Sequence, residues 1–386
     1  MATEHEPPAL PATHRALVLS SVRDPLDITL VPNHPTPSPV PGSAVVRILA
    51  TGVISYAGEV YSGIRSYPFP KPMVPGSSAI GRVAAVGPDA ASLKPGQLVF
   101  LDSFVRGRDD DAARILLGLS DGVTDGSRKL MRDAWRDGTF AEYARLPLEN
   151  CYALDEARLL GSGHADDEGG LGYAVEDLLA IGNMLVPYGG LRDVGLQAGE
   201  KVVVAPATGM FGGSAVPVAL AMGASKVVAM GRNEEMLARL RELGPRVRTV
   251  SIVGDVEAET KALREDGPAN VFFDISPPGT AGSSYFKAGL LSLGQNGRAS
   301  LMGGQWEDVS YPGRAVTTSN LQLRGKWMYE REDVKSFIQL VEGGLVKLGA
   351  AGGIKIVAKF PLEDFQAALD TAAANVGPGL LTVITP

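Results

Sequence analysis

The chain of 386 residues is too long for one ordinary core, because compact domains usually hold roughly 100 to 200 residues. Apolar residues make up 45% and charged residues 20% of the sequence, a balance that excludes a disordered or coiled-coil protein. The formal net charge of −7 argues against a protein that grips phosphate backbones through clustered Lys and Arg. We therefore expect two globular domains and no nucleic-acid partner.

The cysteine content and the absence of long apolar runs bear on the compartment. Cys151 is the only cysteine, so no intrachain disulfide can form and an extracellular disulfide scaffold is excluded. Residues 1–11 contain Glu4, Glu6 and prolines but no apolar segment of a secretory signal. No uncharged apolar run approaches the roughly 20 residues that cross a bilayer. We expect a cytoplasmic protein with no membrane partner.

The N-terminal third is predicted to be mainly β. Short apolar runs bounded by Gly, Pro or Asp are typical of strands in a small antiparallel, barrel-like unit. A Pro-rich turn region is expected at 32–41. The predicted strands are 16–19, 43–49, 81–87 and 97–101.

Two polar stretches follow. Residues 106–137 carry an acidic run at 109–111 and scattered Arg and Lys, a mixture that favours a solvated lobe over a binding site. The Gly-rich loop 161–172 holds His164 beside three acidic residues. One isolated imidazole in such a loop is a weak ligand set, so we predict no metal there.

From Glu200 the pattern becomes strand, Gly-rich turn, helix, strand, which predicts a parallel sheet with helices on its faces. The regular alternation ends near Arg324. The predicted strands are 201–205, 226–230, 271–275 and 298–302, with helices at 212–222, 233–243 and around 284–293. A further helix, 332–343, and a strand, 354–360, come after the alternation.

The turn Ala207-Thr208-Gly209-Met210-Phe211-Gly212 joins the first of these strands to its helix. A pyrophosphate is held by backbone N–H groups and the positive end of a helix, and glycines let the chain approach it closely. Gly209 and Gly212 occupy the second and third glycine positions, and Ala207 takes the first. Glycine-rich turns also occur for structural reasons, but the complete strand-turn-helix-strand context favours a dinucleotide site.

The second strand of this unit ends in Gly231-Arg232-Asn233, where an NAD site would place an acidic residue for the ribose 2′-hydroxyl. Gly231 leaves room, and Arg232 offers a fork of donors for a 2′-phosphate. The sequence therefore favours NADPH over NADH. The alternative is that Arg232 is a solvated side chain at the start of a helix.

The order of these segments resembles the medium-chain dehydrogenase/reductase superfamily. The likeness rests on the turn above and on the segments Val74-Pro75-Gly76, Gly81-Arg82-Val83, 93–99 and 138–143. The resemblance implies an α/β protein in which a GroES-like β-rich catalytic domain, 1–182 with 326–386 returning to it, accompanies a Rossmann domain, 183–325. It also implies a small-molecule substrate, and, by family habit, apolar strands near the end of the Rossmann domain that could continue a sheet across a homodimer.

The resemblance also identifies the places of the zinc ligands. Ile54 stands where a catalytic cysteine is expected, and Ser77 and Ser78 replace a His-Glu pair. Tetrahedral zinc needs thiolate or imidazole ligands, and with Cys151 alone a four-cysteine structural zinc is impossible. We predict no metal. The chain therefore looks closer to the zinc-independent branch, with its quinone oxidoreductases and enoyl reductases.

The resemblance places Tyr56, with Ser55 and Tyr61 as neighbours, at the mouth of the active-site cleft. Tyr56 is the preferred hydroxyl for stabilising charge on the substrate oxygen, although it could equally pack with its hydroxyl on a backbone group. The turns after two later strands should flank the nicotinamide and its ribose, and their residues are Ser276, Pro277, Met302 and Gly303.

These features predict a zinc-independent NADPH-dependent oxidoreductase that transfers hydride to the C=C of an α,β-unsaturated carbonyl or to a quinone. One alternative is a zinc-free ketone or aldehyde reductase, in which the hydroxyl donates to a carbonyl oxygen. Another is a non-catalytic NADPH-binding redox sensor. The residues alone do not separate the three.

Overall fold

The computed structural model describes residues 10–161 and 169–386. The chain divides into two compact units, each of which is described by itself. Unit 1 consists of Met1–Leu179, Ile356–Asn375 and Leu381–Pro386, and unit 2 of Ala180–Lys355 and Val376–Leu380.

The main sheet of unit 1 has seven strands in the order β16-β17-β3-β4-β5-β9, with β8 paired to β3. The pairings of β3, β4 and β5 with one another and with β8, β9 and β17 are antiparallel. The strands are β3 (Ser43–Val53), β4 (Ala79–Val86), β5 (Leu98–Leu101), β8 (Tyr143–Pro147), β9 (Cys151–Ala153), β16 (Lys355–Phe360) and β17 (Leu380–Ile384). This mainly antiparallel arrangement confirms the GroES-like β-rich unit.

A separate hairpin pairs β1 (Thr13–Ser21) with β2 (Asp27–Pro35). The strand β2 enters the region 32–41 that was expected to be a Pro-rich turn, so that expectation is wrong for its first residues. Proline is tolerated there because β2 pairs with β1 alone and its other edge needs no backbone donor.

The polar stretch 106–137 is less solvated than its composition suggests. It contains part of the hairpin β6 (Phe104–Arg106) and β7 (Arg114–Leu116), and the helix α2 (Asp125–Asp133). Thr124 and Ser127 form a capping box at the start of α2. Met131 on α2 is fully buried in the same core as Ile115, so apolar residues anchor the stretch. Its charged residues Arg106 and Asp121 are buried as well.

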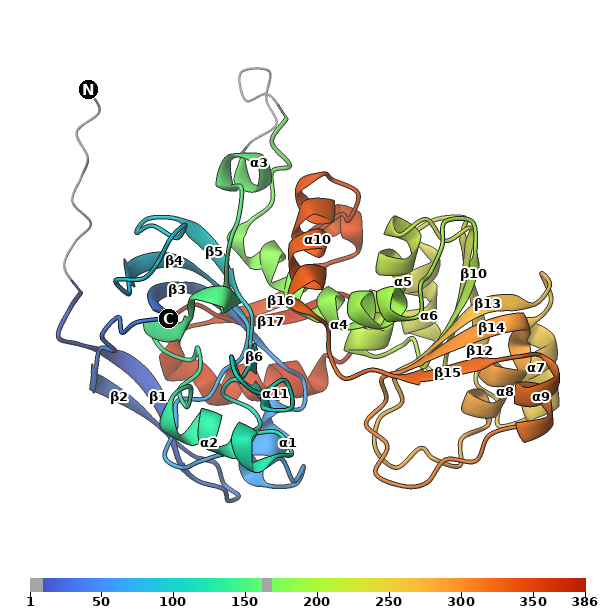
Figure 1. Cartoon of the computed structure of the whole chain (residues 1–386), viewed down its shortest axis with the longest axis horizontal. Coiled ribbons are helices and arrows are strands. Elements are labelled where there is room, and N and C mark those ends of the chain that lie inside the picture. The colour runs from blue at the N-terminus through green and yellow to red at the C-terminus, as the bar shows by residue number, and fades with distance from the viewer. Residues whose placement is uncertain (1–9, 162–168) are drawn as a thin grey trace. The chain divides into compact units, whose positions relative to one another are not determined.

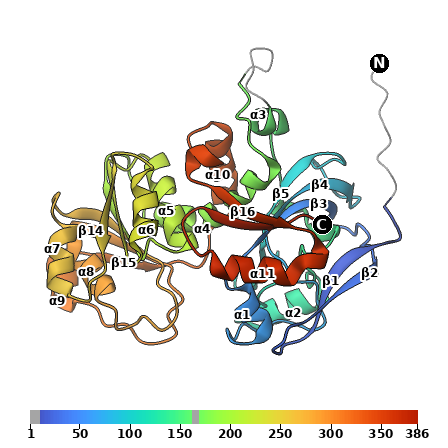
Figure 2. The same cartoon turned by 180° about the vertical axis from the view of Figure 1, so that it is seen from behind.

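Within residues 10–161 and 169–386, three helices besides α2 complete unit 1, together with short 3-10 turns at 148–150, 175–179 and 362–364. Figure 2 shows α11 running alongside β16 and β17. Leu369 and Ala372 of α11 share a core with Val53 and Ile384 of the sheet. The helices are α1 (Ala57–Ser62), α2, α3 (Glu156–Leu160) and α11 (Phe365–Ala374).

Unit 2 contains a six-stranded parallel sheet in the order β12-β11-β10-β13-β14-β15. Numbered from the first strand of the unit, this is the order 3-2-1-4-5-6 of the Rossmann fold. The strands are β10 (Lys201–Ala205), β11 (Lys226–Gly231), β12 (Val247–Ser251), β13 (Ala269–Asp274), β14 (Leu293–Leu301) and β15 (Gln322–Gly325). The predicted Rossmann unit is confirmed.

Helices cover both faces of this sheet, with α4, α5 and α6 on one side and α7, α8 and α9 on the other (Figure 1). The central strand β10 is fully buried and β11 is buried after Lys226, as the uninterrupted apolar runs of a parallel sheet require. The helices are α4 (Ala180–Asp193), α5 (Met210–Ala221), α6 (Glu234–Arg241), α7 (Val256–Leu263), α8 (Ser284–Ser292) and α9 (Gly313–Thr318).

The helix α10 (Arg331–Glu342) belongs to unit 2, together with a short 3-10 turn at 350–352. It packs on α4, where the rings of Phe337 and Tyr188 lie 5.0 Å apart and Arg192 pairs with Asp333 at 3.4 Å. These contacts keep the chain in unit 2 as far as Lys355, later than the return at residue 326 that the resemblance implied.

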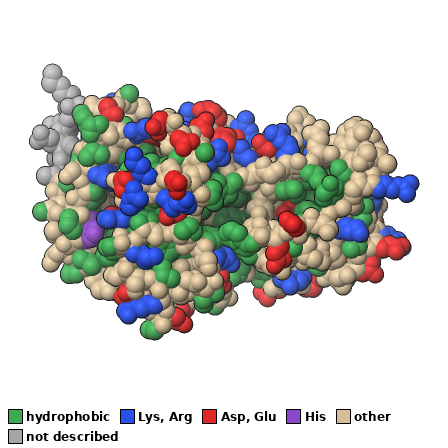
Figure 3. Space-filling model, turned by 60° about the horizontal axis from the view of Figure 1, so that its bottom comes forward, with side chains coloured by type: hydrophobic (Ala, Val, Ile, Leu, Met, Phe, Trp, Pro, Cys, Tyr) green, Lys and Arg blue, Asp and Glu red, His purple; other side chains and the backbone are tan. Residues whose placement is uncertain are grey.

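The face of the molecule in Figure 3 carries Lys and Arg side chains interspersed with Asp and Glu. The face in view therefore has no extended basic patch, which is consistent with the net negative charge of the chain. Among the described residues, no helix has both the length and the apolar character that crossing a bilayer requires.

Candidate functional site

The candidate nucleotide site lies at the carboxyl edge of the sheet in unit 2. The strands β10 and β13 are neighbours there, and the order of strands reverses between them. In open α/β sheets, ligands bind in the crevice outside such a reversal point. The residues that follow β10, β11, β13 and β14 therefore form the rim of the site.

The turn after β10 is compact, and its glycines serve different purposes. The N–H of Ala207 donates to the carbonyl of Met230 at 2.7 Å, which ties the turn to β11. A Cβ on Gly212 would lie 2.0 Å from the carbonyl oxygen of Pro206, so only glycine fits there. A Cβ on Gly209 would meet nothing within 4 Å, so this glycine faces open space. Packing within the chain does not require a glycine at position 209.

The helix α5 begins directly after Gly209 and has no side-chain cap. The N–H groups of Met210, Phe211 and Gly212 precede the first helical donors, so they have no partner inside the helix. Together with the positive end of the helix dipole, they form a cradle for a negatively charged group. The six predicted residues from Ala207 to Gly212 are thus brought together, and the donor set fits a pyrophosphate.

The end of β11 stands beside this turn. A Cβ on Gly231 would lie 2.3 Å from the Cγ2 of Thr208, so the space at Gly231 is filled by Thr208 rather than left open for a ligand. This corrects the expectation that Gly231 leaves room. Arg232 is exposed and makes no hydrogen bond or ion pair with the described residues. Asn233 caps α6 by accepting from the N–H of Met236 at 3.1 Å.

Sequence reasoning missed an acid close to this position. Glu234 opens α6 and accepts a hydrogen bond from the hydroxyl of Ser251, the last residue of β12. Because β12 and β11 are parallel neighbours, this acid lies at the same rim as Arg232. The signal that could have found it is that parallel neighbouring strands bring their carboxyl ends to the same edge of the sheet.

The ends of β13 and β14 are joined through Asp274, which is 2% exposed. Its carboxylate accepts from the hydroxyl and N–H of Ser276 and from the N–H of Gly303, and its carbonyl accepts from the N–H of Met302 at 2.9 Å. A Cβ on Gly303 would lie 2.8 Å from Asp274 Oδ2. Asp274 therefore fixes both turns that the resemblance placed beside the nicotinamide, including Pro277 next to Ser276.

Asp274 is also the most perturbed carboxyl of this rim. Burial raises its pKa from 3.8 to about 6, against the hydrogen bonds from Ser276 and Gly303 that favour the charged form. The hydroxyl of Tyr285 on α8 reaches Ser276 Oγ at 2.9 Å and extends the network into the core. The sequence placed Asp274 in the same segment as Ser276 but gave it no role of its own, and it did not mark Tyr285, because nothing in their spacing distinguishes a turn-fixing acid.

In unit 1, the predicted residue Tyr61 lies on α1 and is 1% exposed. Its hydroxyl donates to the carbonyl of Gly118 at 3.0 Å and accepts from the N–H of Gly76 at 3.2 Å. Burial raises its pKa. Both hydrogen-bonding functions of this hydroxyl are used inside the core, so Tyr61 holds structure together.

Tyr56 occupies the N-cap position of α1 and is half-buried, with half-buried Ser55 preceding it. The guanidinium of Arg65 lies 4.1 Å from the centre of its ring, and the ring of Tyr67 meets it edge-on at 6.3 Å. Burial and the neighbouring Tyr67 raise the pKa of Tyr56, while Arg65 lowers it. A side-chain hydrogen bond with Tyr67 is one cause of this raised pKa. The hydroxyl is neutral at ordinary pH, as in any tyrosine, and can act as a hydrogen-bond donor.

The places of the zinc ligands hold a hydroxyl cluster instead. Thr51 Oγ1 lies 2.7 Å from Thr139 Oγ1, which donates to the carbonyl of Ser77 at 2.9 Å. Ser78 Oγ lies 3.0 Å from Ser103 Oγ. Neutral hydroxyls are poor zinc ligands, and Ile54 packs against the apolar core. This residue set does not fit a catalytic zinc.

The rest of the described chain gives the same result for metals. No group of three or more His, Cys, Asp or Glu within residues 10–161 and 169–386 is placed to hold a metal ion. Cys151 is buried, which raises the pKa of its thiol and keeps it protonated. His164 and the acids around it lie outside the described residues.

Two family models match consecutive parts of the chain. The model described as an alcohol dehydrogenase GroES-like domain matches residues 40–156, and the model described as a zinc-binding dehydrogenase matches residues 211–343. Together they cover more than half of the chain, in the order that the superfamily shares. The chain belongs to the medium-chain dehydrogenase/reductase superfamily. It is accordingly an oxidoreductase of the alcohol dehydrogenase type.

Individual members of the superfamily match most of this chain. L-threonine 3-dehydrogenase of Anaeromyxobacter dehalogenans is 24% identical over 349 residues, covering 87% of this chain and 90% of the relative. D-xylulose reductase A of Aspergillus niger is 24% identical over 348 residues, covering 89% of each. A structure described as a short-chain alcohol dehydrogenase of Escherichia coli CFT073, in complex with NADH, superposes with a TM-score of 0.76 at 17% identity, covering 97% of this chain and 100% of the other.

Proposed function

We propose that this chain is a zinc-independent, NADPH-dependent oxidoreductase that transfers hydride to a small organic acceptor. The observation that carries the proposal is the turn after β10, in which Gly209 faces open space beside the uncapped start of α5. An internal packing role would explain Gly212 but not Gly209. A ligand that must approach the backbone closely explains both.

The cofactor would be held by residues from four strand ends. The backbone from Ala207 to Gly212 would bind the pyrophosphate, and Arg232 would meet the 2′-phosphate of the adenosine ribose. Ser276, Pro277, Met302 and Gly303 would flank the nicotinamide end, in turns that Asp274 holds in place. When bound, the nicotinamide supplies the hydride.

The preference for NADPH rests on the unpaired, exposed guanidinium of Arg232. Arginine offers several N–H donors in a planar fork that matches a phosphate. The nearby carboxylate of Glu234 already accepts from Ser251, which holds it at β12. A ribose 2′-hydroxyl would favour the acid, whereas a 2′-phosphate would favour the arginine.

The hydroxyl cluster favours an acceptor whose reduction needs no metal. Hydride addition to the β-carbon of an α,β-unsaturated carbonyl gives an enolate, whose charge is spread over carbon and oxygen. A neutral hydroxyl can stabilise that oxygen by donating a hydrogen bond, and water can then protonate the α-carbon. Tyr56 is the proposed donor, because the resemblance places its segment at the mouth of the active-site cleft and its hydroxyl is neutral.

A second candidate function is the interconversion of alcohols and carbonyl compounds. It is favoured by the relatives, whose names describe oxidation of threonine, reduction of xylulose and alcohol dehydrogenation. Without zinc, the developing alkoxide would need the full proton of a donor such as Tyr56. This demand is greater than that of an enolate, so we place the candidate second.

Product analysis distinguishes the candidates. Purified protein is incubated with NADPH and, in separate reactions, with enones, quinones, ketones and aldehydes. We expect saturated ketones from enones. Allylic alcohols from the same enones would move the assignment to carbonyl reduction. Tight NADPH binding with no turnover of any acceptor would instead identify a non-catalytic redox sensor. Neither the addition of zinc nor its removal with a chelator should change the rates of NADPH oxidation. A rate that requires zinc would contradict the zinc-independent assignment.

A further inference from the structure

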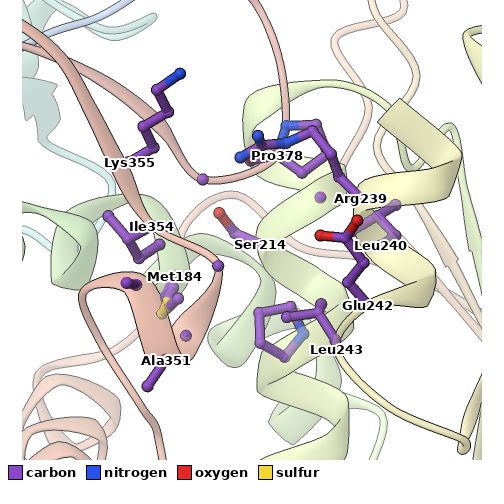
Figure 4. A pocket seen from close by; sticks show the side chains of 16 residues that line it. Met184, Ser214, Arg239, Leu240, Glu242, Leu243, Ala351, Ile354, Lys355 and Pro378 are labelled. Carbon is purple, nitrogen blue, oxygen red and sulfur yellow. The ribbon is translucent and has the colours of Figure 1, made fainter. Parts of the chain in front are cut away.

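A cavity of about 530 Å³ lies wholly within unit 2, on the flank of α5 and outside the turn residues Ala207–Gly212 (Figure 4). One wall is made by α4, α5 and α6, and the opposite wall by residues 350–355 and 378–379. Its volume falls in the range of sites that take small organic ligands, roughly 300 to 1,000 Å³. The proposed oxidoreductase function assigns nothing to this cavity.

Arg239 is the polar side chain that marks the cavity as a site. It extends from α6 to Pro378, whose carbonyl accepts from its Nη2 at a long 3.4 Å. The Nε of the same guanidinium is buried and has no hydrogen-bond partner. Buried donors are normally paired, and a charged group left unpaired is costly. Arg239 is half-buried, and its Nε is the donor of this guanidinium that no acceptor within the described residues pairs.

The charge around Arg239 selects the kind of acceptor. Lys355 stands at the rim, exposed and without an ion pair to the described residues, and its ammonium points outward in Figure 4. Its four-carbon stem is long enough to turn back toward a bound anion. Glu242 is the carboxylate of the same wall. Arg239 and Lys355 carry two positive charges and Glu242 carries one negative charge, so the net charge of the lining is +1. A ligand with one negative charge would neutralise it, whereas a ligand with two would leave an excess negative charge.

The remaining lining suits a carbon chain. Met184, Leu240 and Ile354 are buried apolar side chains from three different segments, and Leu243 and Pro217 extend the same surface. Burial of apolar groups against such a wall is favourable by about 25 cal/mol per Å². The cavity thus combines the guanidinium of Arg239 with a lining whose accessible surface is polar and apolar in about equal parts.

We propose that this cavity binds a small organic monocarboxylate with an apolar body, its carboxylate on Arg239 and its carbon chain against Leu240 and Ile354. The ligand would contact residues 350–355 and 378–379. These segments adjoin the points where the chain passes between the units, at Lys355 and at Leu380.

Isothermal titration of the NADPH-loaded protein with sodium octanoate tests the proposal. We expect saturable 1:1 binding that is independent of NADPH, with 1-octanol and inorganic phosphate each binding at least ten-fold more weakly. Equal binding of 1-octanol would show that the cavity binds apolar chains without recognising a carboxylate. Tighter binding of phosphate would show that the cavity binds inorganic anions rather than organic acids. Competition between octanoate and NADPH would place the ligand in the nucleotide site. Each of these results would overturn the proposal.

Variants locate the site. Arg239→Gln should weaken octanoate binding ten-fold or more, because a charge-assisted hydrogen bond is lost. Ala351→Phe, at an exposed lining position, should block binding by filling space. The matched control is Lys347→Gln, which removes an exposed cation of unit 2 outside the cavity and should bind octanoate normally. If Arg239→Gln fails to fold, the Ala351→Phe and Lys347→Gln pair still decides, since equal affinities would refute the site.

Discussion

At the scale of single residues, the structure separates side chains that the sequence could only group together. Tyr56 and Tyr61 are both tyrosines of one segment, yet the hydroxyl of Tyr61 forms hydrogen bonds with the backbone of Gly118 and Gly76 in the core. Tyr56 is half-buried at the start of α1, with its ring beside the guanidinium of Arg65. Arg232 is exposed without a partner, whereas Asn233 beside it caps a helix. Each distinction leads to a measurable difference between variants.

Replacement of Arg232 by alanine should change the cofactor preference. Loss of hydrogen bonds to a charged phosphate costs about 1.5–3 kcal/mol, so the KM for NADPH should rise roughly ten- to hundred-fold. The KM for NADH should change by less than about three-fold, since NADH has no 2′-phosphate. Steady-state kinetics with both cofactors measures the ratio. Equal losses for the two cofactors would show that Arg232 does not read the 2′-phosphate.

Tyr56→Phe removes the proposed donor while leaving the ring under Arg65. We expect kcat/KM to fall by more than about ten-fold, equivalent to roughly 1.4 kcal/mol, with an unchanged melting temperature. Tyr61→Phe is the matched control: it should lower the melting temperature, because Gly76 N–H loses its acceptor, and should affect kcat only through folding. The opposite pattern would exchange the two assignments.

His14 gives a prediction on acid stability. It is 4% exposed, and burial together with His34 lowers its pKa from 6.5 to about 4, while Glu142 partly opposes the shift. Between these pH values the unfolded chain binds a proton that the folded chain excludes. Stability from this group is therefore complete above pH 6.5 and is lost as pH falls toward 4, by up to about 3 kcal/mol.

The variant His14→Phe retains an aromatic ring against His34 and Tyr143 and removes the titration. Denaturant midpoints measured from pH 4 to 7 should fall less steeply in the variant than in the parent. Parallel profiles would mean that His14 does not exclude a proton in the folded state.

At the scale of elements, the sequence predicts well where local pattern and burial agree. The predicted strand 201–205 is β10, and the predicted helix 212–222 differs from α5 by two residues at its start. Residues 247–251 were missed because Arg248 and Thr249 interrupt the apolar run of β12. The strand β17 was missed because its pairing with β3 joins residues far apart in the sequence. The local sequence pattern predicts individual helices and strands. Long-range strand pairing and side-chain networks such as that of Asp274 can be described only from the three-dimensional structure.

The turn between β10 and α5 yields a test that separates packing from ligand binding. Gly212→Ala should destabilise unit 2 by about 1–3 kcal/mol or more, because its Cβ would lie 2.0 Å from a backbone oxygen. Gly209→Ala should cost at most about 1 kcal/mol of stability. It should nevertheless weaken NADPH binding at least ten-fold, since the added methyl group stands where a phosphate must approach.

The matched control for Gly209→Ala is Gly325→Ala, another position in unit 2 where a Cβ meets nothing within 4 Å. It should leave both melting temperature and NADPH affinity unchanged. If Gly209→Ala binds NADPH as tightly as this control, the cofactor does not lie against the turn.

At the scale of the whole molecule, the superfamily and its two-part organisation follow from the order of motifs, and the family models agree with them. The exact extent of each unit does not follow, because α10 is held to α4 by contacts such as Phe337 on Tyr188 that no local pattern announces. The zinc-independent branch is a proposal that depends on single positions, namely Ile54, Ser77 and Ser78.

The two units should respond to pH in opposite directions. Burial raises the pKa of Asp274 in unit 2 from 3.8 to about 6, so the folded chain keeps a proton that the unfolded chain releases in this window. Its contribution is complete below about pH 4 and is lost as pH rises through 6, the reverse of His14 in unit 1. Asp274→Asn should therefore steepen the acid dependence of stability, and His14→Phe should flatten it. Identical shifts for both variants in denaturation from pH 4 to 7 would contradict the pKa directions.

The account depends on a dinucleotide held at the turn that begins at Ala207. Isothermal titration of the folded protein with NADPH and with NADH tests this most directly. We predict saturable 1:1 binding of NADPH that is at least ten-fold tighter than that of NADH and is lost in Gly209→Ala. No detectable heat with either nucleotide would contradict the central claim.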